Sequence, residues 1–321
     1  MQPLLEVYDL VKRFPVARGP FGQVREEIRA VDGISLHVDK GETLSVVGES
    51  GCGKSTLGRA ILRLVEPSSG ELRIEGKSYV DARPKEMKAV RRRLQAVFQD
   101  PYSSMNPRMR VRDTIAEPLT NFGLTKSAAE TTERVRDLLV QVGLPADAWS
   151  RYPHEFSGGQ RQRVCIARAL APGADLIICD EAVSALDVSV KAQIVNLLSD
   201  LQQRTGVAFL FISHDLAIVE HITHRVAVMY LGKIVEIADR RRLFGNAHHP
   251  YTQALLSSAP EPHLSNRRKR VILKGDIPNP TRPPAGCRFH TRCPSAFARC
   301  RLEEPILRSI DGSHYSACHL N

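Results

Sequence analysis

The stretch from Leu44 to Thr56, LSVVGESGCGKST, constrains the fold more than any other part of the chain. It opens with four apolar or small residues, as a buried parallel strand needs. The spacing G-x-x-x-x-G-K-S follows, in which glycines let the backbone curl and a new helix directs its N–H groups at an anion. The pattern predicts a strand, a loop that binds a nucleoside triphosphate, and a helix that opens at Lys54.

The residues of this loop form the first group of candidate site residues. We expect Lys54 to reach the outer phosphates and Ser55 to ligate Mg²⁺ through its hydroxyl, because Mg²⁺ prefers oxygen ligands and usually arrives with phosphates. A glycine-rich turn without a ligand is the alternative. The whole group is Gly48, Glu49, Ser50, Gly51, Cys52, Gly53, Lys54, Ser55 and Thr56.

Composition is that of a globular chain with one large or two modest domains: 321 residues, 42% of them hydrophobic and 25% charged. Apolar runs such as Val207–Ile212 are far shorter than the ~20 residues that cross a bilayer. The N-terminal region has no apolar stretch with a cleavage site, so we expect no signal peptide and a cytoplasmic chain. In a reducing compartment the seven cysteines are expected to be core residues, redox sites or metal ligands.

The net charge of +10 is concentrated near the C-terminus, where residues 262–302 hold ten basic residues and one acid. The rest of the chain is nearly neutral, which argues against a nucleic-acid-binding surface over the whole protein. A second basic stretch, Lys85 to Arg93, is interpreted as a solvated helix face. We therefore expect no nucleic-acid partner.

Four polar side chains directly follow predicted buried strands, at the edge where open α/β sheets bind ligands. We expect Gln99 to ligate Mg²⁺ or position water, Asp180 to hold Mg²⁺ through water, and Glu181 to polarise an attacking water. His214 is a candidate sensor of the γ-phosphate, with a capping or core role as the alternative. The strands are predicted at Leu94–Phe98, Leu176–Cys179 and Val207–Ile212.

A helical unit is predicted between two parts of the α/β core, because Val111 to Val142 repeats apolar residues at three- and four-residue spacing. It leads to Ser157-Gly158-Gly159-Gln160, where Ser157 can cap a helix whose first N–H groups form a second anion site. Either this helix folds back onto its own phosphate loop, or it serves the nucleotide of a second subunit.

Further strands are expected at the N-terminal end and after the first helix, which is predicted to continue to Leu64. Phe14 stands between two of these strands and either stacks on a nucleotide base or packs in the core. The polar stretch Arg18 to Arg29 is predicted to be a loop. The strands are predicted at Leu4–Leu10, Ile34–Val38 and Glu71–Glu75.

GESGCGKS, Gln99, SGGQ, LIICDE, SALD and His214, in this order and spacing, resemble the ATP-binding subunits of ABC transporters from Leu4 to about Ile237. The resemblance implies an α/β fold: a P-loop NTPase (RecA-like) core with an antiparallel β subdomain and an inserted α-helical subdomain. We expect an ATP-binding domain at residues 1–245, with the helical subdomain at about 100–172, and a C-terminal extension with a cysteine cluster at residues 246–321.

The same resemblance implies a role for each matched residue. Phe156 and Ala182 depart from the family pattern, which usually has leucine before the signature serine and proline after the catalytic glutamate; neither departure removes a catalytic group. The implied catalytic residues are Glu181, His214, Lys54 and Gln99. The implied ATP contacts are Phe14 on adenine, Ser157 to Gln160 across a head-to-tail dimer, Gln99, Asp180, and Asp187 of the D-loop.

The segments NPRMRVRDTIAEPL, DEAVSALDVSVKAQI, RVAVMYLGKIVE and HHPYTQALLSSAPEP resemble importers of dipeptides and oligopeptides, a group that includes nickel importers. The resemblance implies a peripheral subunit on the cytoplasmic face of the bacterial inner membrane. Its partners would be a second ABC ATPase, a paralogue in preference to an identical chain, two permeases and an extracytoplasmic binding protein. A nickel or other small-solute importer is one alternative, and a soluble ABC ATPase of DNA repair or translation is another.

Four cysteines, Cys287, Cys293, Cys300 and Cys318, lie in the last 35 residues and are candidate metal ligands. Structural zinc prefers two to four residues between paired cysteines, so the wider gaps here fit zinc poorly. A [4Fe–4S] cluster is preferred, supported by the resemblance to peptide-importer subunits with such a tail, and Zn²⁺ is the alternative. The surrounding basic residues would offset the cluster's negative charge or lie near anionic lipid.

Overall fold

The computed structural model describes residues 2–18, 24–258 and 271–321, and the chain divides into two compact units. We call them the helical unit and the phosphate-loop unit. The helical unit comprises Met1–Leu4, Val38–Glu42 and Ile74–Ile212. The phosphate-loop unit comprises Leu5–His37, Thr43–Arg73 and Ser213–Asn321.

Three buried parallel strands form the sheet of the helical unit, in the order β6-β7-β8. The register places Leu94 beside Leu176 and Leu176 beside Ala208. The three apolar runs predicted as strands are confirmed, each end within one residue of its predicted place. The strands are β6 (Leu94–Val97), β7 (Leu176–Asp180) and β8 (Ala208–Ile212).

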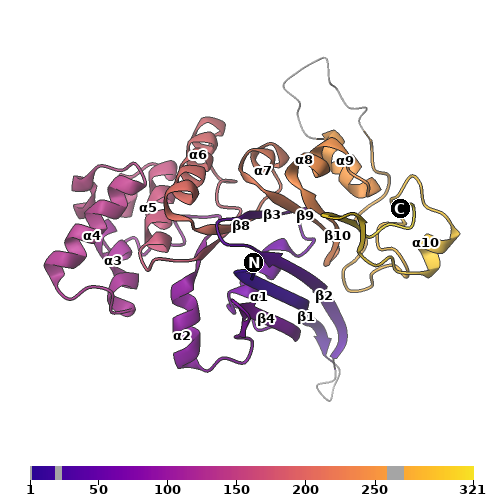
Figure 1. Cartoon of the computed structure of the whole chain (residues 1–321), viewed down its shortest axis with the longest axis horizontal. Coiled ribbons are helices and arrows are strands. Elements are labelled where there is room, and N and C mark those ends of the chain that lie inside the picture. Colours follow the sequence, from indigo (N-terminus) through magenta and orange to yellow (C-terminus); the bar gives the residue numbers. More distant parts are fainter. Residues whose placement is uncertain (1, 19–23, 259–270) are drawn as a thin grey trace. The chain divides into compact units, whose positions relative to one another are not determined.

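Helices α3, α4 and α5 of the helical unit pack against one another and are drawn in magenta in Figure 1. Their contact face consists of the predicted apolar positions, among which Leu119, Val135 and Leu139 are buried. Ser127 caps α4 by accepting from the N–H of Glu130. The remaining elements of this unit and their bounds are β5 (Lys77–Ser78), α2 (Pro84–Arg93), α3 (Val111–Asn121), α4 (Ala128–Gln141), η1 (Ala146–Ser150), η2 (Pro153–Glu155), α5 (Gly158–Leu170) and α6 (Val188–Thr205).

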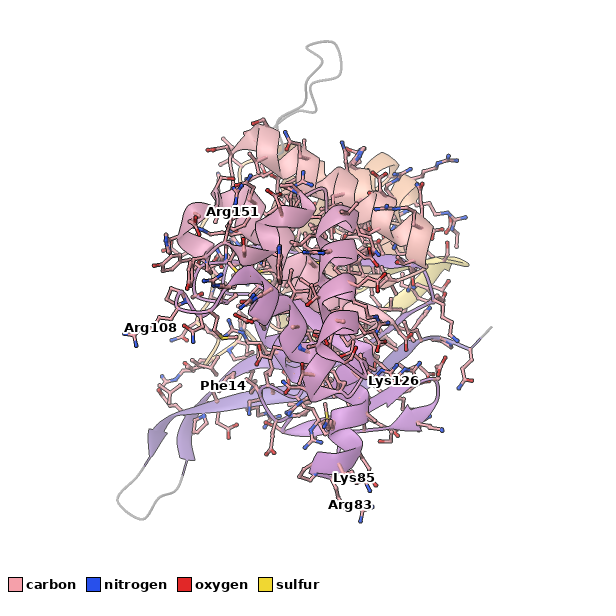
Figure 2. The ribbon with its side chains drawn as sticks, turned by 90° about the vertical axis from the view of Figure 1, so that its left-hand side faces the viewer. Phe14, Arg83, Lys85, Arg108, Lys126 and Arg151 are labelled. Carbon is pink, nitrogen blue, oxygen red and sulfur yellow. The ribbon has the colours of Figure 1, made fainter. Side chains whose placement is uncertain are left out.

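The basic stretch from Lys85 to Arg93 forms α2, whose residues are mostly exposed. Figure 2 shows the side chain of Lys85 extending away from the ribbon near the start of this helix. The interpretation of this stretch as a solvated helix face is confirmed.

In the phosphate-loop unit, β2, β1 and β4 lie side by side in that order (Figure 1). The predicted loop from Arg18 to Arg29 is wrong, since β1 runs to Arg18 and β2 begins at Val24; residues 19–23 lie outside the described residues. Backbone hydrogen bonds can hold a strand whose side chains are polar, so polarity alone misleads here. The strands are β1 (Leu5–Arg18), β2 (Val24–Val38) and β4 (Ser69–Ile74).

A second set of paired strands in this unit has the order β3-β9-β10-β12-β11. β3 pairs with β9 in parallel, and the other pairs are antiparallel. The last two strands belong to the C-terminal extension, for which the sequence predicts no strand, so the extension is part of the sheet. The strands are β3 (Thr43–Val47), β9 (Arg225–Tyr230), β10 (Lys233–Asp239), β11 (Arg308–Asp311) and β12 (His314–Ser316).

The first helix of the phosphate-loop unit ends at Ile61 rather than at the predicted Leu64, because Arg63 adopts a left-handed conformation with φ of 49°. No helix among the described residues is long and apolar enough to cross a membrane. The helices are α1 (Lys54–Ile61), α7 (Leu216–Ile222), α8 (Arg240–Gly245), α9 (Pro250–Ser258) and α10 (Ala298–Leu302).

Candidate nucleotide-binding site

The loop between β3 and α1 has the shape of an anion cradle. Gly48 and Gly53 adopt φ values of 153° and 108°, which favour glycine. A Cβ at Gly48 would collide with the carbonyl oxygen of Met229, and a Cβ at Gly53 with that of Ala30. The tight curl predicted from the glycine spacing is therefore present, and only glycine fits at these two positions.

Lys54 is buried at the start of α1 and folds back over the loop. Its Nζ donates to the carbonyl oxygens of Gly48 at 2.8 Å and Glu49 at 3.0 Å. Gly53 stands at the N-cap without a side-chain cap, so the first N–H groups of α1, which include those of Ser55 and Thr56, open toward the loop. This geometry fits a nucleoside triphosphate, because the lysine Nζ and several backbone donors surround one turn of the loop.

The C-terminal extension contacts the phosphate loop at Glu49, which the sequence did not predict. The backbone N–H of Glu49 donates to the hydroxyl of Tyr251 at 2.8 Å. Its carboxylate accepts two hydrogen bonds from Arg292, at 2.6 and 3.0 Å. The HHPYTQ segment that contains Tyr251 was recognised only as a family resemblance, because no local pattern links residues more than 200 positions apart.

His214 and Phe14 also belong to the phosphate-loop unit. His214 is exposed and follows Ser213, whose N–H donates to the carbonyl of Val46 at 3.2 Å, so it lies at the end of the strand that leads into the loop. Phe14, labelled in Figure 2, lies within β1 and not between two strands as predicted; it is half-buried, with Nζ of Lys12 4.8 Å above its ring centroid. A half-buried ring is compatible with base stacking and does not fill a core.

The two predicted carboxylates stand at the end of β7 in the helical unit. Asp180 is 6% exposed, and Glu181 follows with a φ of 51°, a conformation that a non-glycine residue rarely adopts. The N–H of Glu181 donates to the carbonyl of Ile212 at 3.0 Å, which ties this turn to β8. Gln99 is exposed, two residues after the end of β6.

The SGGQ segment begins α5 with a reciprocal cap. The N–H of Gln160 donates to the Ser157 hydroxyl at 3.3 Å, and the N–H of Ser157 donates to Oε1 of Gln160 at 3.0 Å. A Cβ on Gly159 would overlap Cγ1 of Val190 in α6, whereas one on Gly158 would make an ordinary contact. The reciprocal cap and the close packing of Gly159 against Val190 therefore fix the backbone on which the exposed Ser157 stands.

Three other positions of the helical unit complete the motifs. Phe156 and Ala182, the two departures from the family pattern, are buried and fill the core. Asp187 is exposed at the N-cap of α6. The predicted nucleotide-site residues thus divide between the two units: the phosphate loop, Phe14 and His214 lie in one, and the remaining nucleotide-site residues in the other.

The seven cysteines are free thiols of two kinds. Cys52, Cys165 and Cys179 are buried in the core, where burial raises the pKa of Cys165 to about 11 and of Cys179 to about 12. These three match the expected core role. Their raised pKa values keep the thiols neutral and inert.

The four cysteines of the extension are not arranged as a metal site. Burial, and then the charges of the other three thiols, raises the pKa of Cys287 to about 11. Across the described residues, no group of three or more His, Cys, Asp or Glu side chains is arranged to hold a metal ion. The structure therefore does not support the expected [4Fe–4S] or zinc ligand set as formed.

Family models match two parts of the chain. A model described as "ABC transporter" matches residues 31–184, and one described as "Oligopeptide/dipeptide transporter, C-terminal region" matches residues 235–300. The second match begins within β10 and covers the segment that supplies Tyr251 and Arg292 to the phosphate loop.

Curated relatives match over almost the whole length. The probable peptide ABC transporter ATP-binding protein y4tS of Sinorhizobium fredii is 54% identical, across 99% of this chain and 90% of that protein. The oligopeptide transport ATP-binding protein AppF of Bacillus subtilis is 48% identical, across 99% of this chain and 98% of that protein.

Solved structures share the cassette fold. A dimeric, post-hydrolysis state of the ATP-binding cassette MJ0796 with ADP and Pi has a TM-score of 0.66 at 26% identity, covering 74% of this chain and 99% of that one. CbiO1 from Clostridium perfringens has the same score and identity, covering 77% and 92%. With the phosphate loop, the signature helix and the matching extension in place, the chain belongs to the ATP-binding, ATP-hydrolysing subunits of peptide ABC transporters.

Proposed function

We propose that this subunit drives the import of dipeptides or oligopeptides through partner permeases. The observation that carries the proposal is the extension: the part that matches the oligopeptide/dipeptide transporter model continues the sheet through β12 and reaches the phosphate loop. The names of the relatives, which include peptide import and oligopeptide transport proteins, support the same solute class.

The ATP-hydrolysing site is proposed to form between two cassettes. The phosphate loop of one subunit holds ATP, and Ser157 to Gln160 of the second subunit approach the same nucleotide head-to-tail; the dimeric MJ0796 cassette supports such a pair. Lys54 stabilises charge on the transferring phosphoryl group, and Glu181 orients the attacking water. His214 senses the γ-phosphate, and Phe14 stacks on the base.

Magnesium, when bound with ATP, supplies positive charge to the phosphates. Ser55, Asp180 and Gln99 are the residues proposed to hold it: a hydroxyl, a carboxylate and an amide, all oxygen donors. Asp180 is buried at the end of its strand, so its carboxylate is held in one place and does not sample solvent freely.

The partners proposed are a second ATPase subunit, a paralogue in preference to a copy of this chain, two permeases and an extracytoplasmic binding protein. The subunit would lie on the cytoplasmic face of the inner membrane. We further propose a domain boundary at 245/246, with a helical subdomain at about residues 100–172. The boundary falls at the end of α8, just before the segment with Tyr251.

A [4Fe–4S] cluster on Cys287, Cys293, Cys300 and Cys318 is a separate proposal. Its support is that the other three thiols contribute to the raised pKa of Cys287, and that the N–H of Cys287 donates to the carbonyl of Cys300 at 2.8 Å. Formation of the ligand set would require deprotonation of the thiols and a rearrangement of the side chains on metal binding.

The test of peptide import is reconstitution with two permeases and a second ATPase subunit from the same genome. Proteoliposomes that contain the complex and the binding protein should accumulate labelled di- or oligopeptides only with ATP, and Lys54→Ala in this chain should abolish uptake. Accumulation of Ni²⁺ without peptide would overturn the peptide assignment. Neighbouring genes for DNA repair or translation, with no permease, would overturn import itself.

A further inference from the structure

Glu49 is an acid inside a loop that binds polyphosphate. It is the first residue after Gly48 in the G-x-x-x-x-G-K-S pattern, and its side chain is 24% exposed. A carboxylate at this place repels the phosphates of the nucleotide. Because the carboxylate is partly buried, dissolved salt screens this repulsion only weakly. Left alone, Glu49 would therefore oppose nucleotide binding.

Arg292 of the extension neutralises this carboxylate. Its two terminal nitrogens donate to the two carboxylate oxygens at 2.6 and 3.0 Å, a bidentate arrangement that fixes geometry as well as charge. The Arg292 side chain is 8% exposed and lies 6.0 Å from the ring centroid of Tyr230. A guanidinium this buried is held in place and does not act as a solvated surface charge.

Tyr251 fixes the backbone of the same residue. Its ring is fully buried against Tyr230 and Phe289, at centroid distances of 4.7 and 5.3 Å, and its hydroxyl accepts from the N–H of Glu49. The carbonyl of Glu49 in turn accepts from Nζ of Lys54. One residue of the loop thus connects the extension to the lysine that binds phosphate.

We infer that Arg292 and Tyr251 are positioning residues for the ATP site, acting through Glu49, and that the C-terminal extension thereby sets the nucleotide affinity of its own subunit. Arg292 removes the repulsion between Glu49 and the phosphates, and Tyr251 holds the loop backbone in its curled form. The inference rests on the ATP-binding assignment and is independent of the transported solute.

The test is equilibrium binding of MgADP to the full-length chain by calorimetry. Arg292→Gln keeps a polar side chain of similar length but leaves Glu49 uncompensated, so the Kd should rise roughly three- to tenfold, as loss of one close charge pair predicts. Adding Glu49→Gln to Arg292→Gln should restore the Kd to near the wild-type value. In ATPase assays, KM should rise in Arg292→Gln and return toward the wild-type value in the double variant, as Kd does, while the kcat of Arg292→Gln stays unchanged.

Arg299→Gln is the matched control, because it makes the same change in the same extension but breaks an exposed pair with Glu303. Its Kd should equal that of the wild type. Equal Kd values for Arg292→Gln and Arg299→Gln would overturn the inference. The inference would also be overturned if Arg292→Gln bound MgADP weakly and Glu49→Gln failed to restore binding, since Arg292 would then act only on folding.

Tyr251→Phe tests the backbone contact separately. It retains the buried ring and removes the acceptor for Glu49, so the Kd should rise while the thermal unfolding midpoint changes by only a few degrees. An unchanged Kd would remove Tyr251 from the inference. Wild-type protein that binds no MgADP would instead count against the ATP-binding assignment, so the two failures are distinguishable.

Discussion

Nε2 of His314 lies 2.7 Å from Oε1 of Glu236, and both side chains are buried, at 2% and 0% exposure. The same carboxylate accepts from the backbone N–H groups of His248 at 2.7 Å and His249 at 3.1 Å. One acid of β10 therefore joins the strand β12 and the entry to α9. This contact fixes the start of α9, the helix that carries Tyr251, against β10.

Glu236→Gln should lower the free energy of unfolding by about 1–3 kcal/mol, because it replaces one buried acceptor oxygen by an NH2 group that faces hydrogen-bond donors. Urea denaturation measures this loss. Glu303→Gln, which breaks the exposed pair with Arg299, should leave the free energy of unfolding nearly unchanged. Equal unfolding midpoints for the two variants would show that the buried carboxylate does not hold the extension.

Because the imidazole of His249 is buried, the free energy of unfolding should depend on pH. Burial lowers its pKa to about 3, against 6.5 for an ordinary histidine. Between these values the unfolded chain binds a proton that the folded chain does not, so this residue's contribution is complete above pH 6.5 and is lost as the pH falls toward 3. Through this one group, the free energy of unfolding should fall by up to about 1.4 kcal/mol for each pH unit below 6.5.

The measurement is urea unfolding of wild type and His249→Asn between pH 4.5 and 7.5. Asparagine supplies an acceptor for the N–H of Tyr251, which now donates to Nδ1 of His249 at 3.1 Å. The variant should have a shallower slope below pH 6.5, and exposed His154→Asn should keep the wild-type slope. Parallel curves for wild type and His249→Asn would show that His249 is not the group responsible.

Local sequence patterns predicted the elements that bury apolar residues at regular spacing. The strand Leu176–Asp180 and the helix after the phosphate loop are examples, because their side-chain pattern directly reports burial. The strands β1 and β2 were predicted only in part, at Leu4–Leu10 and Ile34–Val38, because the polar side chains nearer to residues 19–23 give no apolar alternation. The contact between Glu49 and Arg292 was also missed, because charge pairing across 243 positions leaves no periodic signal.

Gly159 of α5 lies too close to Val190 to carry a larger side chain. Gly159→Ala should destabilise the chain by about 1–3 kcal/mol through overpacking against Val190. Gly158→Ala should cost less, since its new methyl would meet only Leu186 at 3.5 Å. Thermal unfolding distinguishes the two, and Val190→Ala should rescue Gly159→Ala. A double variant as unstable as Gly159→Ala would place the clash elsewhere.

Glu181→Gln and Lys54→Ala should separate hydrolysis from binding. Glu181→Gln leaves the phosphate loop intact, so it should bind ATP normally yet lose most turnover, because the amide no longer orients water as a base. Lys54→Ala removes the buried cation of the loop and should weaken binding itself. ATPase near the wild-type rate in the assembled transporter would remove Glu181 from catalysis, and equal ATP affinity of both variants would contradict the division of roles.

The four extension cysteines give the last prediction, for protein purified without oxygen. If Cys287, Cys293, Cys300 and Cys318 hold a [4Fe–4S] cluster, the protein should be brown, absorb near ~400 nm and contain about four irons per chain, whereas zinc would be colourless with one metal. Cys300→Ser should then loosen the extension, seen as faster proteolysis, and raise the Kd for MgADP, because Arg292 lies beside Cys293 on the same loop. Colourless, metal-free protein whose four thiols all react with an alkylating reagent in the folded state would reject both metals, and the raised pKa of Cys287 would then reflect burial of an ordinary thiol.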